Sequence, residues 1–479
     1  MYWCWPCSNL IKLLYSFVIY STLHFANIAP LNHVLFFVTI ADVTRAKNNN
    51  DRLKLLIAAA KEFNHNDPRK HDSDIKAGAI AFLCSILRSC SPYFIARSKE
   101  IQNCLTIILC LYRCSEERLC ASFCTDGSTL TLDLLELIEI NYRLGKRGDA
   151  KSLVLAQNVI YKLCQARVPL TMVRGQEELL SSLVGNINGV TGRFVMHLSM
   201  KMIASLSEHE HNKLVMFAFP GLMESIAVGS SHMCEAVREE SARIVMNLAL
   251  EARNKAHLIQ GNNQYWLDAV LALSRGSSVA KSYSLQTLGC LATSPENKVI
   301  MVQHKNCVVL DTLLQVATSR IVPSQDCINA TRIICNLICQ ATASEIGRHP
   351  GLLVTLSSLA CREDKLAVVA AMAVKKIATY VRYKDSCHQE LLQTLVTMSY
   401  GKVTEVLKWT VKAFYEQASF PRNRVKMIAH KGLLTALSVL SNDKNDFVRE
   451  NAEEVLNALA GKFVNALFFV FRSENESNN

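Results

Sequence analysis

The feature that most constrains the fold is a sequence pattern, an apolar helical segment followed by a polar break, that repeats every 42 or 43 residues. In residues 237–261, apolar or small side chains recur at the three- and four-residue spacing of one buried helical face. A polar break follows at Asn254-Lys255, and it returns at Asn297-Lys298, 43 positions later, and at Asn212-Lys213, 42 positions earlier. A single helix cannot bury its own apolar face, so a unit that recurs at this period predicts stacked neighbours sharing one long core.

The composition favours helices over strands. Half of the 479 residues are hydrophobic and 19% are charged, which excludes disorder for most of the chain. The 18 glycines and 10 prolines leave few breaks, and runs alternating at period two between turn signals are hard to find. We therefore predict an all-α protein.

Charge and cysteine content narrow the class of protein further. Lysine plus arginine exceed aspartate plus glutamate by 52 − 41 = 11, and this surplus is spread along the chain, so it permits an acidic partner without identifying one. Most of the 18 cysteines occupy apolar helical positions, where a free thiol acts as a small hydrophobic group. A chain long enough to build a large core does not need a disulfide framework, so we expect reduced thiols in a reducing compartment.

The first 50 residues are predicted to be an apolar N-terminal segment and a linker. Residues 13–41 contain no Asp, Glu, Lys or Arg, and an apolar run of roughly 20 residues can span a bilayer. Asn27, Pro30 and two histidines interrupt the run, and the site for signal cleavage is poor. Two interpretations stay open: a membrane anchor, or buried segments and an extension outside the fold.

The rest of the chain divides by the regularity of its pattern. Residues 51–190 are predicted to form irregular helical repeats, and residues 191–461 regular ones that end at Gly461, a residue typical of helix ends. Residues 462–479 are predicted to hold a helix with four phenylalanines that caps the open end, followed by a disordered tail from Ser473.

Several phrases in the regular part resemble the repeat signature of the armadillo family. They are Asn247-Leu248-Ala249 with Asn254-Lys255, Cys290-Leu291-Ala292 with Asn297-Lys298, Lys431-Gly432-Leu433-Leu434, and Arg348-His349-Pro350-Gly351-Leu352-Leu353. The resemblance covers residues 192–461 well and 51–190 weakly, and it implies a right-handed α-α superhelix, the armadillo-type solenoid. HEAT repeats fit less well, because a longer helix after a short break recurs here.

The resemblance also implies a binding surface. In armadillo proteins the longest helix of each unit lines a concave groove that holds an extended peptide, and importin-α-type members carry Trp and, four residues later, Asn in that helix. The corresponding pairs in this chain are Lys201/Ser205, Arg243/Asn247, Gln286/Cys290, Arg332/Asn336, Met372/Lys376 and Trp409/Ala413. Only Asn247 and Asn336 keep the Asn and only Trp409 keeps the Trp, which argues against a receptor for nuclear-import signals.

The expected groove is mildly basic. Lys201, Arg243, Arg332 and Lys376 occupy groove positions, and the hypothesis is that they receive an acidic or phosphorylated segment, as in catenin-type armadillo proteins. The competing interpretation is an ordinary solvated face. A stripe of cations interleaved with exposed aromatics, which nucleic-acid binding requires, is not visible, so a nucleic-acid-associated basic solenoid is a weaker alternative.

Motifs for catalysis or metal binding are weak. Cys104, Cys110, Cys114, Cys120 and Cys124 lie four to six residues apart among apolar side chains, which favours core packing over a zinc site. The sequence His209-Glu210-His211 lacks the spacing of a zinc hydrolase, and phosphate-binding loops, nucleophile elbows and kinase signatures are missing. The glycosylation motif at Asn329 falls on an expected helix with Thr331 near its core face.

These observations predict a non-catalytic scaffold or adaptor without cofactors. Its expected partner is a protein or peptide with an extended or acidic segment held in the groove. The expected location is the cytoplasm or nucleus, and a scaffold tethered to a membrane by residues 13–41 is the alternative.

Overall fold

The computed structural model describes residues 83–90, 96–111, 128–144, 148–164, 170, 175–189, 192–260, 265–319, 324–382 and 384–476. In these ranges every regular element is a helix, and the chain has an all-α superhelical repeat fold, as predicted. The apolar run at 13–41 lies outside the described residues, as does most of the cysteine cluster after Cys104. Among the described helices, none is by itself long and apolar enough to cross a membrane. The helices Asn212–Ala218 and Leu222–Ser230 meet the criteria of length and composition only when taken together, and they are bent by 89° relative to each other.

The chain divides into two compact units, one ending at Gly229 and the other beginning at Ser230. The described part of unit 1 includes a helical stretch at 83–90 and the helices α5 (Ser98–Leu111), α7 (Ser128–Leu144), α8 (Ala150–Leu163), α9 (Gln176–Asn188), α10 (Arg193–Glu208), α11 (Asn212–Ala218) and α12 (Leu222–Ser230, whose last residue crosses the division). Within this unit α8 packs against α5 and α7, while α9 packs against α7 and α10.

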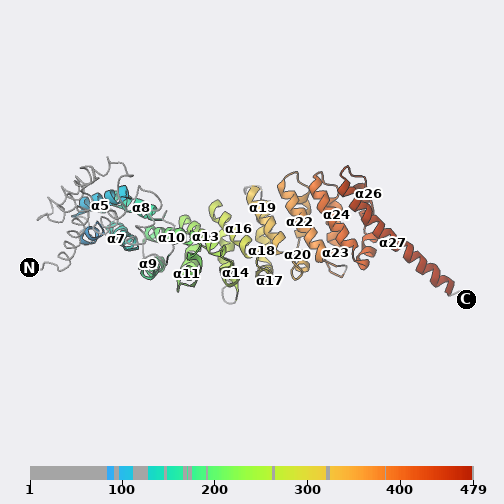
Figure 1. Cartoon of the computed structure of the whole chain (residues 1–479), viewed down its shortest axis with the longest axis horizontal. Helices are drawn as coiled ribbons and strands as arrows, with labels where there is room; N and C mark the ends of the chain where they lie inside the picture. Colours follow the sequence, from blue (N-terminus) through green and yellow to red (C-terminus); the bar gives the residue numbers. More distant parts are fainter. Residues whose placement is uncertain are drawn as a thin grey trace, which may run out of the picture. The chain divides into compact units, whose positions relative to one another are not determined.

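Unit 2 is built from modules of a short, a middle and a long helix (Figure 1). The short helices are α14 (Ala252–Ile259), α17 (Pro295–Gln303), α20 (Ala343–Arg348) and α25 (Pro421–Ala429). The middle helices are α15 (Tyr265–Ser274), α18 (Val308–Thr318), α21 (Leu352–Ala360), α23 (His388–Met398) and α26 (Leu433–Leu440). The long helices are α13 (Glu235–Ala249), α16 (Ser278–Leu291), α19 (Ser324–Leu337), α22 (Lys365–Tyr380), α24 (Thr404–Ala418) and α27 (Asp446–Glu476).

The long helices of unit 2 form one continuous layer. Each packs against the next, from α13 through α16, α19, α22 and α24 to α27. The spacing of buried positions that begins at Val237 in α13 recurs in every following long helix up to α24. The offset from one helix to the next is 43 residues to α16, 46 to α19, 40 to α22 and 40 to α24. One apolar pattern therefore docks every long helix in the same way.

Local signals define where the helices begin. Asp364 accepts hydrogen bonds from the backbone N–H groups of Leu366 and Ala367, and it thereby satisfies two donors that α22 cannot pair internally. Gly351 and Gly432 precede the middle helices α21 and α26 with φ of 72° and 82°, a conformation that favours glycine. These caps separate one apolar helix from the next.

The asparagines of the repeating phrase join the modules. Asn212, Asn254 and Asn297 are buried, and each donates from Nδ2 to the backbone carbonyl six residues earlier, at the end of the preceding long helix. Asn297 also donates to the Lys255 carbonyl at 2.8 Å, one module back. A buried backbone carbonyl needs a donor, so the recurring asparagine has a structural reason.

The module of α23 and α24 lacks a short helix, and a side-chain network occupies the junction. Gln417 is buried at the end of α24, and its Nε2 donates to the carbonyls of Ala378 at 2.5 Å and Val381 at 3.0 Å. Its Oε1 accepts from Asn423 Nδ2 at 2.8 Å and lies 2.9 Å from His388 Nε2. Since the two carbonyls fix the orientation of the amide, the His388 Nε2–H is the donor in that last contact.

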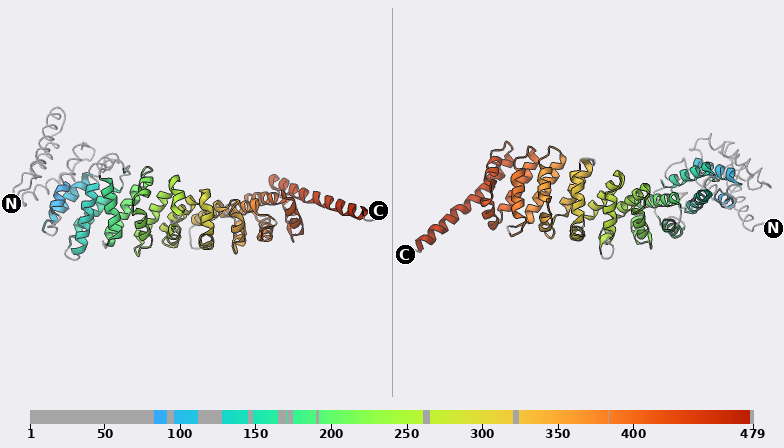
Figure 2. Two further views of the ribbon diagram at one scale, coloured as in Figure 1. Left: turned by 90° about the horizontal axis from the view of Figure 1, so that it is seen from below. Right: turned by 180° about the vertical axis from the view of Figure 1, so that it is seen from behind.

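The C-terminal helix corrects one boundary predicted from the sequence. Gly461 does not end a helix, because α27 runs without a break from Asp446 to Glu476. Figure 2 shows α27 continuing beyond α26 in both views. The expected disordered tail therefore begins inside a helix at Ser473, and residues 477–479 lie outside the described part of the chain.

Candidate protein-binding face

The outward side of the long helices in unit 2 presents two rows of side chains, here called the long-helix face. The buried pattern places these residues at equivalent positions in successive helices. The first row is Arg243, Gln286, Arg332, Met372 and Lys412, and the second row is Asn247, Cys290, Asn336, Lys376 and Glu416. The sequence-derived pairs of α13, α16, α19 and α22 thus share one surface.

The last predicted pair is out of register. Ala413 is fully buried and takes the place of Ala373 in the buried pattern, 40 residues later, so it does not belong to an outward row. Lys412 and Glu416 lie 40 residues after Met372 and Lys376, which is the offset between the buried patterns of α22 and α24. Trp409 is half-buried and lies one turn before Lys412. The tryptophan is therefore beside the first row rather than in it.

Two of the four cations in these rows, Arg243 and Lys376, are bound within the chain. The Arg243 guanidinium lies 3.3 Å from a Glu240 carboxylate oxygen on the same helix. Lys376 donates to the Cys335 carbonyl at 3.0 Å, across from α22 to α19. Lys375, next to the second row, forms an ion pair with Glu416 at 3.0 Å. These contacts give the face a mixed charge, because carboxylates lie beside the cations that the sequence placed in a mildly basic groove.

Two cations of the first row have no ion pair among the described residues. Arg332 is exposed on α19. The Lys412 ammonium lies 4.8 Å from the Trp409 ring centre and 5.2 Å from that of Phe447 on α27. Both distances are within the range of cation–π attraction, which holds the ammonium while leaving its N–H groups available for an acceptor.

The neutral residues of the rows differ in exposure. Gln286 is exposed and donates weakly to Ser282 Oγ at 3.4 Å, whereas Asn336 is half-buried. Asn247 is buried within α13 and does not present its amide freely on the surface. Of the two asparagines that the family resemblance singled out, only Asn336 has the exposure that a clamp on a peptide requires.

Lys201 belongs to unit 1, where its ammonium lies 3.9 Å from the centre of the Tyr161 ring. Ser205, its predicted companion, is buried and donates to the Cys164 carbonyl. Both side chains therefore contact α8 or its C-terminal cap, so this pair differs from those of unit 2.

The sequences considered for metal binding or modification have structural contacts instead. Among the described residues no group of three or more His, Cys, Asp or Glu side chains is arranged to hold a metal ion. Burial and the neighbouring His211 lower the pKa of His209, and the two rings lie 5.4 Å apart. Asn329 accepts a hydrogen bond from Gln325, and Thr331 of the same glycosylation motif is fully buried. The cysteines of the described segments are free thiols.

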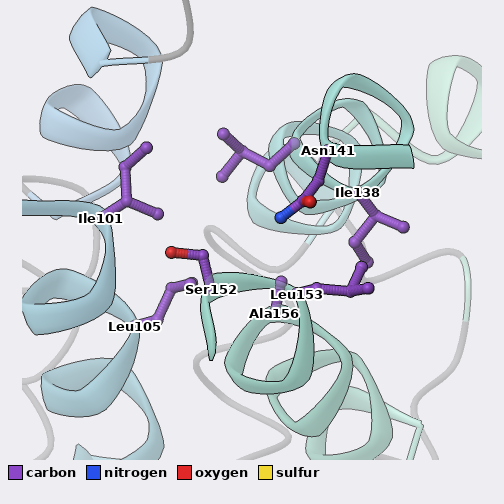
Figure 3. Close-up of a pocket in the computed structure, with 8 residues that line it drawn as sticks. Ile101, Leu105, Ile138, Asn141, Ser152, Leu153 and Ala156 are labelled. Atoms are coloured by element: carbon purple, nitrogen blue, oxygen red, sulfur yellow. The ribbon is translucent and has the colours of Figure 1, made fainter. Parts of the chain in front are cut away.

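The concavity between α5, α7 and α8 in unit 1 offers no room for a ligand. Its lining, shown in Figure 3, is mainly aliphatic, with Asn141 and Ser152 as the polar members, and no space for a water molecule remains inside. Asn141 donates to the Asp149 carbonyl at 2.7 Å, and Ser152 donates to the Asp149 carboxylate. This is a packing gap around the start of α8, with its polar groups already bound.

Sequence reasoning missed Lys412, Glu416 and the aromatic contact from Phe447. The signal for the first two was present, since the apolar pair Val406-Leu407 repeats Leu366-Ala367 after 40 residues. The contact of Phe447 with Lys412 joins two helices and has no signature in the sequence.

Comparison with known proteins supports the fold. No protein-family model matches the chain, and no curated protein matches its sequence. An engineered protein solved by the Northeast Structural Genomics Consortium is similar with a TM-score of 0.54 and 15% identity, over 88% of this chain and 98% of its own. UNC-45 from Drosophila melanogaster is similar with a TM-score of 0.45 and 12% identity, over 95% of this chain but 63% of its own length. The chain is a helical repeat solenoid.

Proposed function

We propose that the chain is a non-catalytic scaffold of the armadillo type, and that its long-helix face binds an extended segment of a partner protein. The observation that carries the proposal is the continuous layer of long helices, in which the two rows repeat at the same position in each helix from α13 to α24. A preformed surface of this kind lowers the ordering cost of binding on the scaffold side. The module of short, middle and long helices agrees with the armadillo resemblance of its sequence.

The charges of the face favour a peptide with acidic residues. Arg332 and Lys412 are the first-row cations without a carboxylate partner in the described residues, and both can form charge-assisted hydrogen bonds. Glu416 belongs to the second row and Glu240 lies beside Arg243 of the first, so a uniformly anionic phosphate backbone meets repulsion there. This alternation supports a protein partner over a nucleic acid. The free thiols of the described residues suit a reducing compartment, and we place the scaffold in the cytoplasm or nucleus.

The test uses a display library of linear peptides panned against the full chain, with affinities of the recovered peptides measured by fluorescence anisotropy. We expect acidic peptides, and a loss of affinity of about tenfold or more in Arg332→Glu or Lys412→Glu. A charge-assisted hydrogen bond contributes about 1.5–3 kcal/mol, and 1.4 kcal/mol corresponds to tenfold.

The matched control is Arg253→Glu, which makes the same change at an exposed position on the short helix α14. Equal losses in the control and the two test variants would show that net charge alone drives binding. Recovery of no peptide, or peptides indifferent to both first-row variants, would contradict the proposal.

A further inference from the structure

The last module of unit 2 exposes a position that the earlier modules bury. Leu434, the second residue of α26, is 43% exposed, whereas Leu353 at the same place in α21 is fully buried. The two are equivalent because each lies two residues after the glycine that precedes its helix, Gly432 or Gly351. In α21 the neighbouring helix α23 packs alongside, and among the described residues no such helix follows α26.

The long helix α27 shows the same change. Asn445 accepts from the Val448 N–H as Asp364 accepts from the Ala367 N–H, which sets α27 in register with α22 and hence with α24. Phe447 then corresponds to the buried Val406 of α24 and is 38% exposed. Further along the helix, Glu454 is exposed where α24 has the buried Ala413, and Val455 remains buried as Phe414 does.

These residues define an end face, consisting of Leu434, Phe447 and Glu454. Terminal repeats of solenoids usually carry a polar outer surface, because an apolar end invites association. Here the end face keeps a leucine and a phenylalanine that a following module would cover. The chain therefore exposes at this end one of the two apolar surfaces that a hydrophobic contact requires.

The other half lies in the extension of α27, residues 462–476. Its sequence from 463 to 471, FVNALFFVF, is apolar except for Asn465, and a helix that is apolar on most of its surface favours burial. Because α27 is one unbroken helix, its extension leads away from α26 and cannot turn back onto its own end face. At 1.5 Å per residue the extension is about 22 Å long.

We propose that two copies of the chain pair through their C-terminal ends, with the extension of each copy packed on the end face of the other. Each copy supplies both halves of the contact but cannot join them within itself, and a two-fold pair joins both at once. The charges agree with this arrangement. Glu450, Glu453 and Glu454 are exposed on the first half of α27, while Lys462 and Arg472 bracket the apolar run of the extension.

The test is the molar mass of the full chain by light scattering after size exclusion, over a range of concentrations. We expect a dimer for the wild type, and a monomer for Leu434→Glu and for Phe468→Glu, which alter the end face and the extension separately. Circular dichroism establishes that each variant keeps its helices. The control is Val354→Glu, an equally non-conservative change at an exposed position of the interior helix α21, and it is expected to stay dimeric.

A photo-crosslinking amino acid at position 434 tests the arrangement directly. We expect a crosslink between two copies that maps by mass spectrometry to residues 462–476. A monomeric wild type overturns the proposal, including the case in which that monomer binds neutral lipid vesicles through the extension. A dimer that survives Leu434→Glu and crosslinks elsewhere also overturns it.

Discussion

Gln417 offers a sharp test of how the module without a short helix is held in place. Its side chain is buried and makes four hydrogen bonds, two as donor to the carbonyls of Ala378 and Val381 and two as acceptor from His388 and Asn423. Gln417→Leu keeps a similar volume but removes all four. We therefore expect the junction between α22, α24 and α25 to open more readily.

The size of the effect follows from the groups left without partners. Each buried polar group that loses its partner costs about 1–3 kcal/mol, so four groups at the lower limit cost about 4 kcal/mol. Burying an apolar side chain in place of the amide offsets about 1 kcal/mol of this. The net loss of about 3 kcal/mol corresponds to a roughly 100-fold increase in the local opening equilibrium.

Native-state hydrogen exchange followed by mass spectrometry suits this measurement, because repeat arrays often do not unfold in one step. Peptides from α22 and α24 should exchange roughly 100-fold faster in Gln417→Leu, and peptides from α13 and α16 should change little. The control is Gln393→Leu, the same substitution at an exposed position of α23. If both variants exchange alike in α24, the network does not stabilise the junction and the reasoning is wrong.

Three further predictions concern the same modules and unit 1. Burial lowers the pKa of His388 despite the hydrogen bond to Gln417, so the folded state favours the neutral ring. The contribution of His388 to the free energy of unfolding should be fully present above the unfolded pKa near 6.5 and should be lost as the pH falls below it. Urea titrations at several pH values should show a smaller pH dependence for His388→Gln. Gly351→Ala should destabilise α21 by about 1 kcal/mol in exchange measurements, because φ is 72° although the added Cβ meets no atom within 4 Å. Gly185→Ala should instead stabilise α9 by about 0.5–1 kcal/mol, because Gly185 is inside a helix with equally open space.

The period of the repeat could be read from the sequence because it has a local physical cause. Each junction asparagine is bound to a carbonyl six residues before it, as Asn254 is to Leu248 and Asn212 to Leu206, so the requirement acts within one short phrase. The apolar spacing of each long helix is equally local. Fold class therefore followed from residues close together in the chain.

The charge of the candidate face could not be read in the same way. Lys375 meets Glu416 across two helices, 41 residues apart, and Lys376 binds the Cys335 carbonyl from the helix before. Such contacts depend on how neighbouring modules are aligned, and the sequence of one module does not specify that alignment. Trp409 lies outside the first row because the buried pair Val406 and Leu407, rather than the tryptophan, sets the register of α24.

The separation between inward and outward positions has a consequence for function. The buried pattern docks every long helix, and second-row residues such as Lys376 and Glu416 add contacts between neighbouring helices. First-row residues without an ion pair among the described residues can therefore change without altering the fold. Substitutions at Arg332 or Lys412 should then change which peptides bind while hydrogen exchange in the long helices stays the same. Substitution of Asn297, which is fully buried, should do the reverse and weaken the stack near α16 and α17 before it affects selectivity. A variant of Arg332 that loosened the stack would show that the two roles are not separable in this chain.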